Sequence, residues 1–225
     1  MNEKDRYMDP MTEFGIQRLF GTEANNDLAI DLVNSLLHGQ DEIREMHHLP
    51  TERVRGLSVY DTWCLNAKGE RVIVQIQQAY PHPAFKDRTL YYGAKGISER
   101  WLNQDDDFIQ GVYLIHLLDF TTEDFATDSF VHEVGLVDQS LHTLFDNRLR
   151  FYFVEVPKCH QETGELKSQA DKWIYALRHL PALEARPEAL HEPIFARLFD
   201  VADRQRFTPA ERTAYEASLW KKKNA

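Results

Sequence analysis

The chain has 225 residues, a hydrophobic content of 43% and a formal net charge of −10. This length suits a single globular domain, and no apolar run approaches the roughly 20 residues that a membrane-spanning helix needs. The acidic balance argues against a protein that coats nucleic acid through bulk electrostatics, because neutralising phosphates needs Lys and Arg at the contact surface. A local basic groove is not excluded.

Cysteine and histidine usage excludes several further classes. The two cysteines, Cys64 and Cys159, are too few for a disulfide framework and lie in strand-like segments, so we interpret both as small buried residues. The ten histidines form no recognisable zinc ligand set. The N-terminal residues MNEKDRYMDP lack the apolar segment of a signal peptide, and we therefore expect a cytoplasmic protein with no membrane partner.

Two helices are predicted before the first strand. Apolar residues recur at helical spacing over residues 28–37, which predicts an amphipathic helix. Asp9, Pro10 and Glu13 lie ahead of it and indicate the start of a shorter helix.

A β-hairpin over residues 57–78 carries the most informative residue types. Alternation places Asp61 on the same face as apolar neighbours such as Trp63, where an unpaired carboxylate would cost several kcal/mol of desolvation. The second strand points Gln75 and Gln77 one way, and residues 66–69 mark the turn. Asp61 should then lie opposite Gln75 at roughly 5 Å, with Gln77 following on that face. This geometry suits a metal site that has only one carboxylate.

The rest of the chain predicts an α/β order with a mixed sheet. Two prolines break the chain before a helix over about residues 84–103, and apolar runs predict strands at 111–118 and 149–156. Helices follow over 166–180 and 193–204, and a capping box at residues 208–211 opens a last one. We interpret the charge run at 221–223 as a solvated tail rather than a DNA contact.

The helix after the hairpin carries a basic and aromatic face. Arg88, Tyr91, Tyr92 and Lys95 recur at i, i+3, i+4 and i+7. Such a face could contact phosphates or stack on a base. An equally good interpretation is a core-packing helix whose tyrosines are buried and whose cations reach solvent.

Several ordered motifs together resemble one known family. They are DRYMDPMTEFGIQRLFGTEANNDLAIDLVNSLL, YDTWCLNAKGERVIVQIQ, FKDRTLYYGAK, FVEVPK and ADKWIYAL. The chain resembles the recombination-promoting nuclease (Rpn) family of PD-(D/E)XK proteins, often called nuclease family transposases, from about Asp5 to Trp220.

The resemblance implies a restriction-endonuclease-like core, a mixed β-sheet flanked by helices, in a domain of residues 1–180 with a C-terminal helical extension of residues 181–225 packed on it. It also implies a DNA endonuclease that uses Mg²⁺, or Mn²⁺ in its place, and that is linked to recombination, transposition or phage defence. Asp61, Gln75, Gln77 and Glu13 match the catalytic pattern. Asp61, Gln75 and the Ile76 carbonyl match the metal ligands.

We expect nucleic-acid contacts at Arg88, Tyr91, Lys95 and Lys158. Arg88 matches a family position beside the site. Lys158 follows Glu155 in the family's E-x-P-K pattern and could reach a phosphate, although a salt bridge to a nearby acid is an equally good interpretation. A homodimer is one expectation, because many nucleases of this fold dimerise to address two strands.

Two positions depart from the family pattern. Gln75 stands where the family has Glu, and Ile16-Gln17 stands where it has Phe-Lys. A glutamine keeps an oxygen ligand but removes a negative charge, so metal affinity and nuclease activity should fall. The alternative is a catalytically inactive protein that binds DNA or a partner as a regulatory module.

Ordinary structural roles also remain open for the site residues. Asp61 could accept hydrogen bonds from turn amides, and the two glutamines could lie on a solvated strand face. Glu13 could simply complement a helix dipole.

Overall fold

Six α-helices and seven β-strands lie in the part of the chain that the computed structural model describes, residues 5–37, 42–48, 52–54, 57–79, 85–102 and 109–224. They are, in order, α1 (Glu13–Phe20), α2 (Asn26–Leu36), β1 (Ile43–His48), β2 (Glu52–Val54), β3 (Leu57–Asn66), β4 (Arg71–Ala79), α3 (Phe85–Leu102), β5 (Ile109–Leu118), β6 (Val131–Asp138), β7 (Thr143–Glu155), α4 (Gln169–His179), α5 (Pro193–Ala202) and α6 (Pro209–Lys223).

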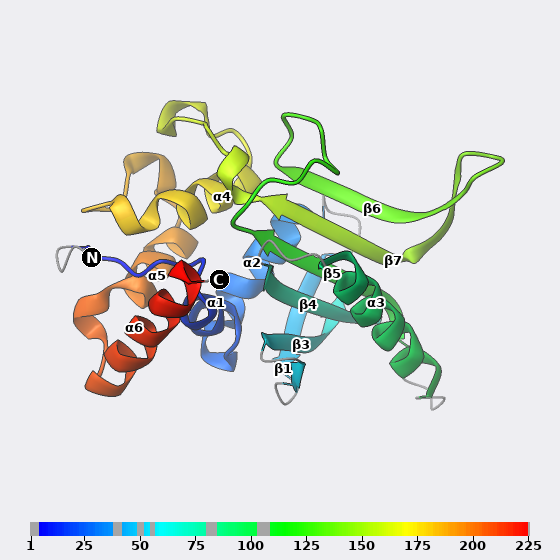
Figure 1. Cartoon of the computed structure of the whole chain (residues 1–225), viewed down its shortest axis with the longest axis horizontal. Helices are drawn as coiled ribbons and strands as arrows, with labels where there is room; N and C mark the ends of the chain where they lie inside the picture. Colours follow the sequence, from blue (N-terminus) through cyan, green and yellow to red (C-terminus); the bar gives the residue numbers. More distant parts are fainter. Residues whose placement is uncertain are drawn as a thin grey trace.

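The strands form one mixed sheet with helices on both faces (Figure 1). Its order is β1-β3-β4-β5-β7-β6, and β2 pairs with the first residues of β3. The β3–β4 and β6–β7 pairs are antiparallel, whereas β4–β5 and β5–β7 are parallel. The predicted α/β class with a mixed sheet is therefore confirmed.

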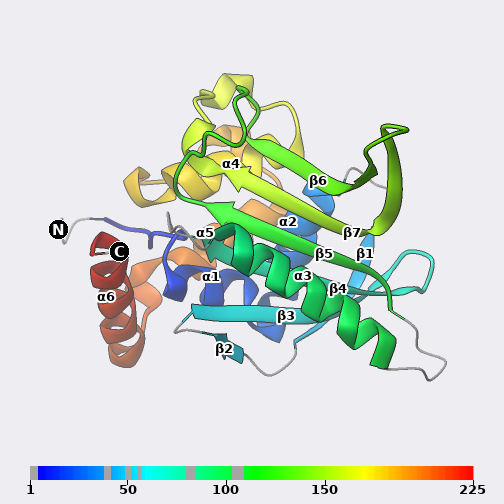
Figure 2. The same cartoon turned by 45° about the vertical axis from the view of Figure 1, so that its right-hand side comes forward.

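The centre of the sheet is buried on both faces. Every residue from 111 to 118 in β5 is buried, which confirms the interpretation of that apolar run. Successive residues alternate between two hydrophobic clusters: Leu114 belongs to the cluster beneath α3, and Ile115 to the cluster beneath the other helices. Helix α3 thus covers one face of the sheet, and the other α-helices lie on the opposite face, as Figure 2 shows.

The C-terminal helices share the core of the opposite face. Trp173 of α4, Phe195 of α5 and Tyr215 of α6 belong to the same buried cluster as Leu19 of α1 and Leu32 of α2. The helices after residue 180 therefore pack directly against the N-terminal ones, while the division into domains at that residue stays a prediction.

The observed helices agree closely with the helices predicted from the sequence, whereas the edge strands were not predicted. The Thr208–Glu211 capping box is present, and both cysteines are free and buried as expected. Strand β7 begins six residues before the predicted strand, and β1, β2 and β6 were not predicted. Within the described ranges, no helix combines the length and apolar content that crossing a bilayer requires.

Two glycines let α3 approach the sheet. A Cβ atom on Gly96 would lie 2.6 Å from a methyl carbon of Val112 on β5, and one on Gly93 would lie 2.9 Å from the ring of Phe151 on β7. Both distances are shorter than a carbon–carbon contact allows. These glycines therefore set the height of α3, and of its Arg88, above β5 and β7.

Replacing Gly96 with Ala should destabilise the protein by about 1–3 kcal/mol through overpacking, although alanine favours helix formation by about 1 kcal/mol. The measurement is the midpoint of urea unfolding. Gly164→Ala is the control, because a Cβ there would meet nothing within 4 Å. Equal stability of the two variants would contradict the close approach of α3.

Candidate functional site

The β3–β4 hairpin brings the two central candidate residues into one register position. Asp61 pairs with Gln75, as the sequence predicted, and Gln75 pairs on its other side with Leu114 of β5. Two residues later, Gln77 pairs with His116. Since Leu114 lies in the cluster beneath α3, positions 75 and 77 belong to that face of the sheet. The side chains of Asp61, Gln75 and Gln77 lie outside the described part of the structure.

Ile76 separates the two glutamines and belongs to the opposite face. Its side chain is 3% exposed and packs in the cluster shared with α1 and α2. The backbone of Ile76 pairs with Tyr60 on one side and Ile115 on the other. Burial of this side chain fixes which way the flanking positions face.

Glu13 is the first residue of α1, directly after the N-cap Thr12, whose hydroxyl accepts a hydrogen bond from the Gly15 amide. Helix α1 lies against β4, the strand of Gln75. The Glu13 carboxylate accepts a hydrogen bond of 2.7 Å from Lys221 at the end of α6. Glu13 therefore both sits at the positive end of a helix and pairs with a cation.

Helix α6 is attached to the start of the chain by polar contacts. The Phe14 amide donates to the Ser218 hydroxyl and the Asp9 amide donates to the Tyr215 hydroxyl, whose pKa burial raises to about 12. Lys222 donates to Asp9 at 2.9 Å and lies 3.9 Å from Asp119, the residue after β5. The charge run at 221–223 is therefore part of α6 rather than a tail, although Lys221 and Lys223 are exposed to solvent as expected.

We call Asp9, Glu13, Asp119, Lys221 and Lys222 the carboxyl-end cluster, because Asp119 directly follows the carboxyl end of β5. Burial raises the pKa of Asp119, Lys222 opposes that shift, and the charge of Asp9 adds to it. Open α/β sheets bind ligands outside the carboxyl ends of their strands. Acids held there by lysines form a polar region in which a cation or a phosphate could replace one partner.

The predicted basic and aromatic face of α3 is split. Tyr92 is 1% exposed and packs in the core, whereas Tyr91 is 53% exposed. Arg88 and Lys95 are half-buried. The core-packing interpretation therefore holds for Tyr92, and Tyr91, Arg88 and Lys95 are the members that solvent reaches.

His116 is a buried imidazole next to the position of Gln77. Its ring stacks on Phe153 at 4.9 Å and meets the edge of Phe85 at 5.8 Å. Neither ring nitrogen has a hydrogen-bond partner among the residues that the structure describes, and the same is true of the buried Nε of Arg88. Burial, reinforced by the charge of Arg88, lowers the pKa of His116 to about 3. The imidazole is therefore neutral near pH 7.

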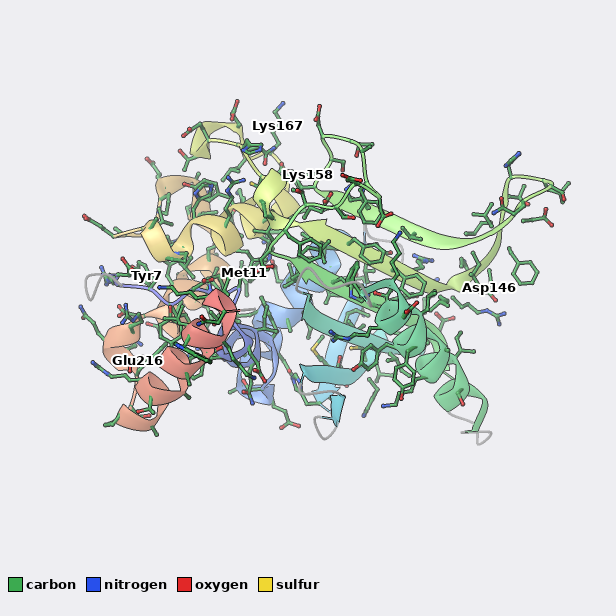
Figure 3. All side chains as sticks on the ribbon, viewed as in Figure 1. Tyr7, Met11, Asp146, Lys158, Lys167 and Glu216 are labelled. Carbon is green, nitrogen blue, oxygen red and sulfur yellow. The ribbon has the colours of Figure 1, made fainter. Side chains whose placement is uncertain are left out.

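Lys158, labelled in Figure 3, forms the ion pair that the sequence left as one of two interpretations. Its ammonium lies 2.5 Å from the Glu155 carboxylate and donates to the carbonyls of Phe125 and Thr127. Glu155 is fully buried and also accepts from the Thr122 amide at 2.7 Å. A contact between Lys158 and a phosphate would require breaking this network.

Metal ligands can be assigned only in part. No group of three His, Cys, Asp or Glu side chains that could hold an ion occurs among the residues whose side chains are described. Asp61 lies outside that set. The donors at its register position, a carboxylate and a glutamine amide oxygen, are hard oxygen ligands of the kind that Mg²⁺ takes.

A model of the PD-(D/E)XK nuclease family transposases matches residues 10–224. The chain belongs to this family. Comparisons with curated proteins and with solved structures found no match. Family membership supports a nuclease-like or transposase-associated function. PD-(D/E)XK nucleases generally use divalent metal ions, and the β3–β4 hairpin is the candidate place for such an ion.

For this PD-(D/E)XK protein the sequence singled out Glu13 but neither His116 nor the other members of the carboxyl-end cluster as site residues. The only signal for His116 was a lone polar residue inside the apolar run of β5. Lys221 and Glu13 lie 208 residues apart, and no local pattern pairs them.

Acid should destabilise the protein through His116. Because the pKa is about 3 in the folded state and about 6.5 in the unfolded state, the unfolded chain binds the proton first. The free energy of unfolding should fall as pH drops below about 6.5, by up to about 1.4 kcal/mol per pH unit until about pH 3. Urea unfolding of His116→Phe at pH 7 and pH 5 should show that this contribution is lost, whereas His160→Phe, at an exposed histidine, should retain it. An unchanged slope in His116→Phe would contradict the buried neutral imidazole.

Replacing Lys158 with Met should reduce stability by about 3–5 kcal/mol, because the buried Glu155 carboxylate loses its cation. Thermal or urea unfolding measures the loss. Lys167→Met changes an exposed lysine nearby and should have little effect. A Lys158→Met variant as stable as the control would show that the ion pair is dispensable.

Proposed function

We propose that this protein is a Mg²⁺-dependent endonuclease that hydrolyses phosphodiester bonds of DNA, with an activity weakened by Gln75. The observation that supports this most is the β3–β4 register, which pairs Asp61 with Gln75 in a chain of the PD-(D/E)XK nuclease family. Mn²⁺ is expected to substitute for Mg²⁺. We further propose a cytoplasmic role in recombination, transposition or phage defence.

The proposed ligands are the Asp61 carboxylate, the Gln75 side-chain oxygen and the Ile76 carbonyl. A divalent ion bound there would polarise the scissile phosphate and lower the pKa of a water molecule. Gln77, an uncharged amide, would orient the attacking water but cannot take its proton at neutral pH. Glu13 would bind water or a second ion once it is released from Lys221, with which it pairs at 2.7 Å.

The proposed DNA contacts lie on α3. Arg88 has a buried Nε that lacks a hydrogen-bond partner in the described structure, and Tyr91 is exposed one turn further along the helix. Together with Lys95 they would position the phosphate backbone without reading sequence. Lys158 is left out of this set because its ammonium already pairs with Glu155 and donates hydrogen bonds to two backbone carbonyls.

The alternative function is a catalytically inactive module that binds DNA or a protein on the same scaffold. Gln75 is the observation that favours it, because one carboxylate fewer weakens the hold on a divalent cation. In either case we propose a homodimer, which would let two copies address two DNA strands.

Plasmid cleavage with Mg²⁺ or Mn²⁺ tests the nuclease. Asp61→Ala should lower the cleavage rate by at least about 10³-fold, because it removes the proposed anionic ligand and with it several kcal/mol of transition-state stabilisation. Gln75→Glu should lower the Mg²⁺ concentration needed for half-maximal cleavage by at least about tenfold. Asp128→Ala, at an exposed acid, is the matched control and should cleave normally.

Cleavage that survives Asp61→Ala would indicate another site or a contaminating nuclease. If no version cleaves, Gln75→Glu included, while circular dichroism shows intact folding, the enzyme reading fails. Binding of labelled duplex DNA by the same samples, followed by fluorescence anisotropy, would then decide whether the inactive module binds DNA.

A further inference from the structure

The hairpin between β6 and β7 extends beyond the sheet. Strand β7 begins at Thr143, but its pairing with β5 begins only at Leu149. Residues 136–146, which we call the arm, therefore pair only with each other, as Leu136 with Asp146 and Val137 with Leu144. Figure 1 shows this ribbon projecting from the body of the molecule. A two-stranded ribbon is at best marginally stable in water without a surface to pack on.

The arm is apolar where it is exposed. Leu141 is 70% exposed, Leu144 58% and Phe145 77%. The residues 136–146 contain Asp138 and Asp146 but neither Lys nor Arg. Arg148, two residues after the arm, pairs with Asp146, so the arm offers a phosphate backbone no excess of cations. An apolar protein surface fits it better.

The same chain carries a complementary apolar surface. A pocket of about 260 Å³ lies between the start of α3 and the sheet and is lined mainly by aromatic and aliphatic side chains, among them Phe85, Leu90, Phe125 and Phe153. Leu90 and the neighbouring Tyr91 are exposed. Lys86, at the same pocket, pairs with Asp124 at 2.6 Å, so these two charged side chains balance each other and the pocket is mainly apolar.

An arm cannot fill the pocket of its own chain. Val134 of β6 lines the pocket, and the strand continues from there to Asp138. Four residues of strand advance about 13 Å, so the ribbon carries its tip away from the pocket. Figure 3 labels Asp146 at the far end of β7, well beyond α3's first turns.

We propose that a second copy of this chain covers these surfaces, with the arm of each copy packed on the α3 pocket of the other. Among the described residues, the exposed large hydrophobic side chains are Leu136, Val137, Leu141, Leu144 and Phe145 on the arm, Leu90 and Tyr91 on α3, and Trp220 on α6. All but Trp220 and Tyr91, which is proposed above as a DNA contact, lie on the two proposed contact surfaces. In a dimer with a twofold axis, each arm would cover the pocket of the other chain, so that no arm and no pocket stays exposed. The dimer does not depend on nuclease activity.

The molar mass in solution tests the dimer, by light scattering after size-exclusion chromatography over a range of concentrations. The natural chain should have about twice the 26.3 kDa of one chain. An arm variant, Leu141→Ser with Leu144→Ser and Phe145→Ser, should dissociate at a concentration at least about tenfold higher than the natural dimer does. Trp220→Ser is the matched control, because it removes an equally exposed hydrophobic side chain outside both surfaces and should leave the dimer unchanged.

A pocket variant, Leu90→Glu, should dissociate in the same way. Mixing the arm variant with the pocket variant should restore dimers, because one of the two arm-to-pocket contacts in the mixed pair is intact. Dimers formed by arm-to-arm contact would gain nothing from mixing, and that result would overturn the proposal. So would a natural chain that stays monomeric at all concentrations, which would assign the arm to a different protein, or an arm variant that dimerises normally.

Discussion

The pairing of β3 with β4 is the constraint on which the candidate site depends. It sets Asp61 opposite Gln75, and the parallel pairing of β4 with β5 then brings position 77 beside His116. A slip of one residue would exchange the two faces of β4. Burial of Val72, Val74 and Ile76 under α1 and α2 makes that slip costly, because glutamines would then enter a packed apolar core. The apolar half of β4 thus determines where the polar half lies.

How far the sequence predicts this fold depends on how completely each element is buried. Strand β5 is buried on both faces, so its residues form a continuous apolar run that can be recognised without a structure. Strands β1 and β6 lie at the edges of the sheet, carry charged and histidine residues, and are only partly buried. Edge strands need little apolar surface, and their sequences therefore resemble loops. The capping box of α6 was predictable because it is a local hydrogen-bond pattern.

The candidate site likewise has contacts that local sequence predicts and contacts that depend on the tertiary fold. The pairing of Asp61 with Gln75 follows from local alternation and a short turn, and it was predicted correctly. The partner of Lys221 was not predicted, because Glu13 reaches it through the tertiary fold. For Lys158 the sequence left a salt bridge open, but it gave no sign of the Phe125 carbonyl, which the tertiary fold also brings close. The spacing of Tyr91 and Tyr92 on α3 could not tell which ring would be buried, since that depends on how the helix is rotated on the sheet.

The attachment of α6 to the start of the chain has a consequence for how ionic strength acts on this protein. The pairs of Lys221 with Glu13 and of Lys222 with Asp9 are partly exposed, so dissolved ions screen them. Added salt also weakens the attraction of any protein for a phosphate backbone. For the proposed DNA substrate the two effects oppose each other at Glu13: screening releases the Glu13 carboxylate from Lys221, and it also weakens the attraction for phosphate. A salt titration of the proposed DNA binding would therefore report also on how helix α6 is attached, and its slope would not be a count of phosphate contacts.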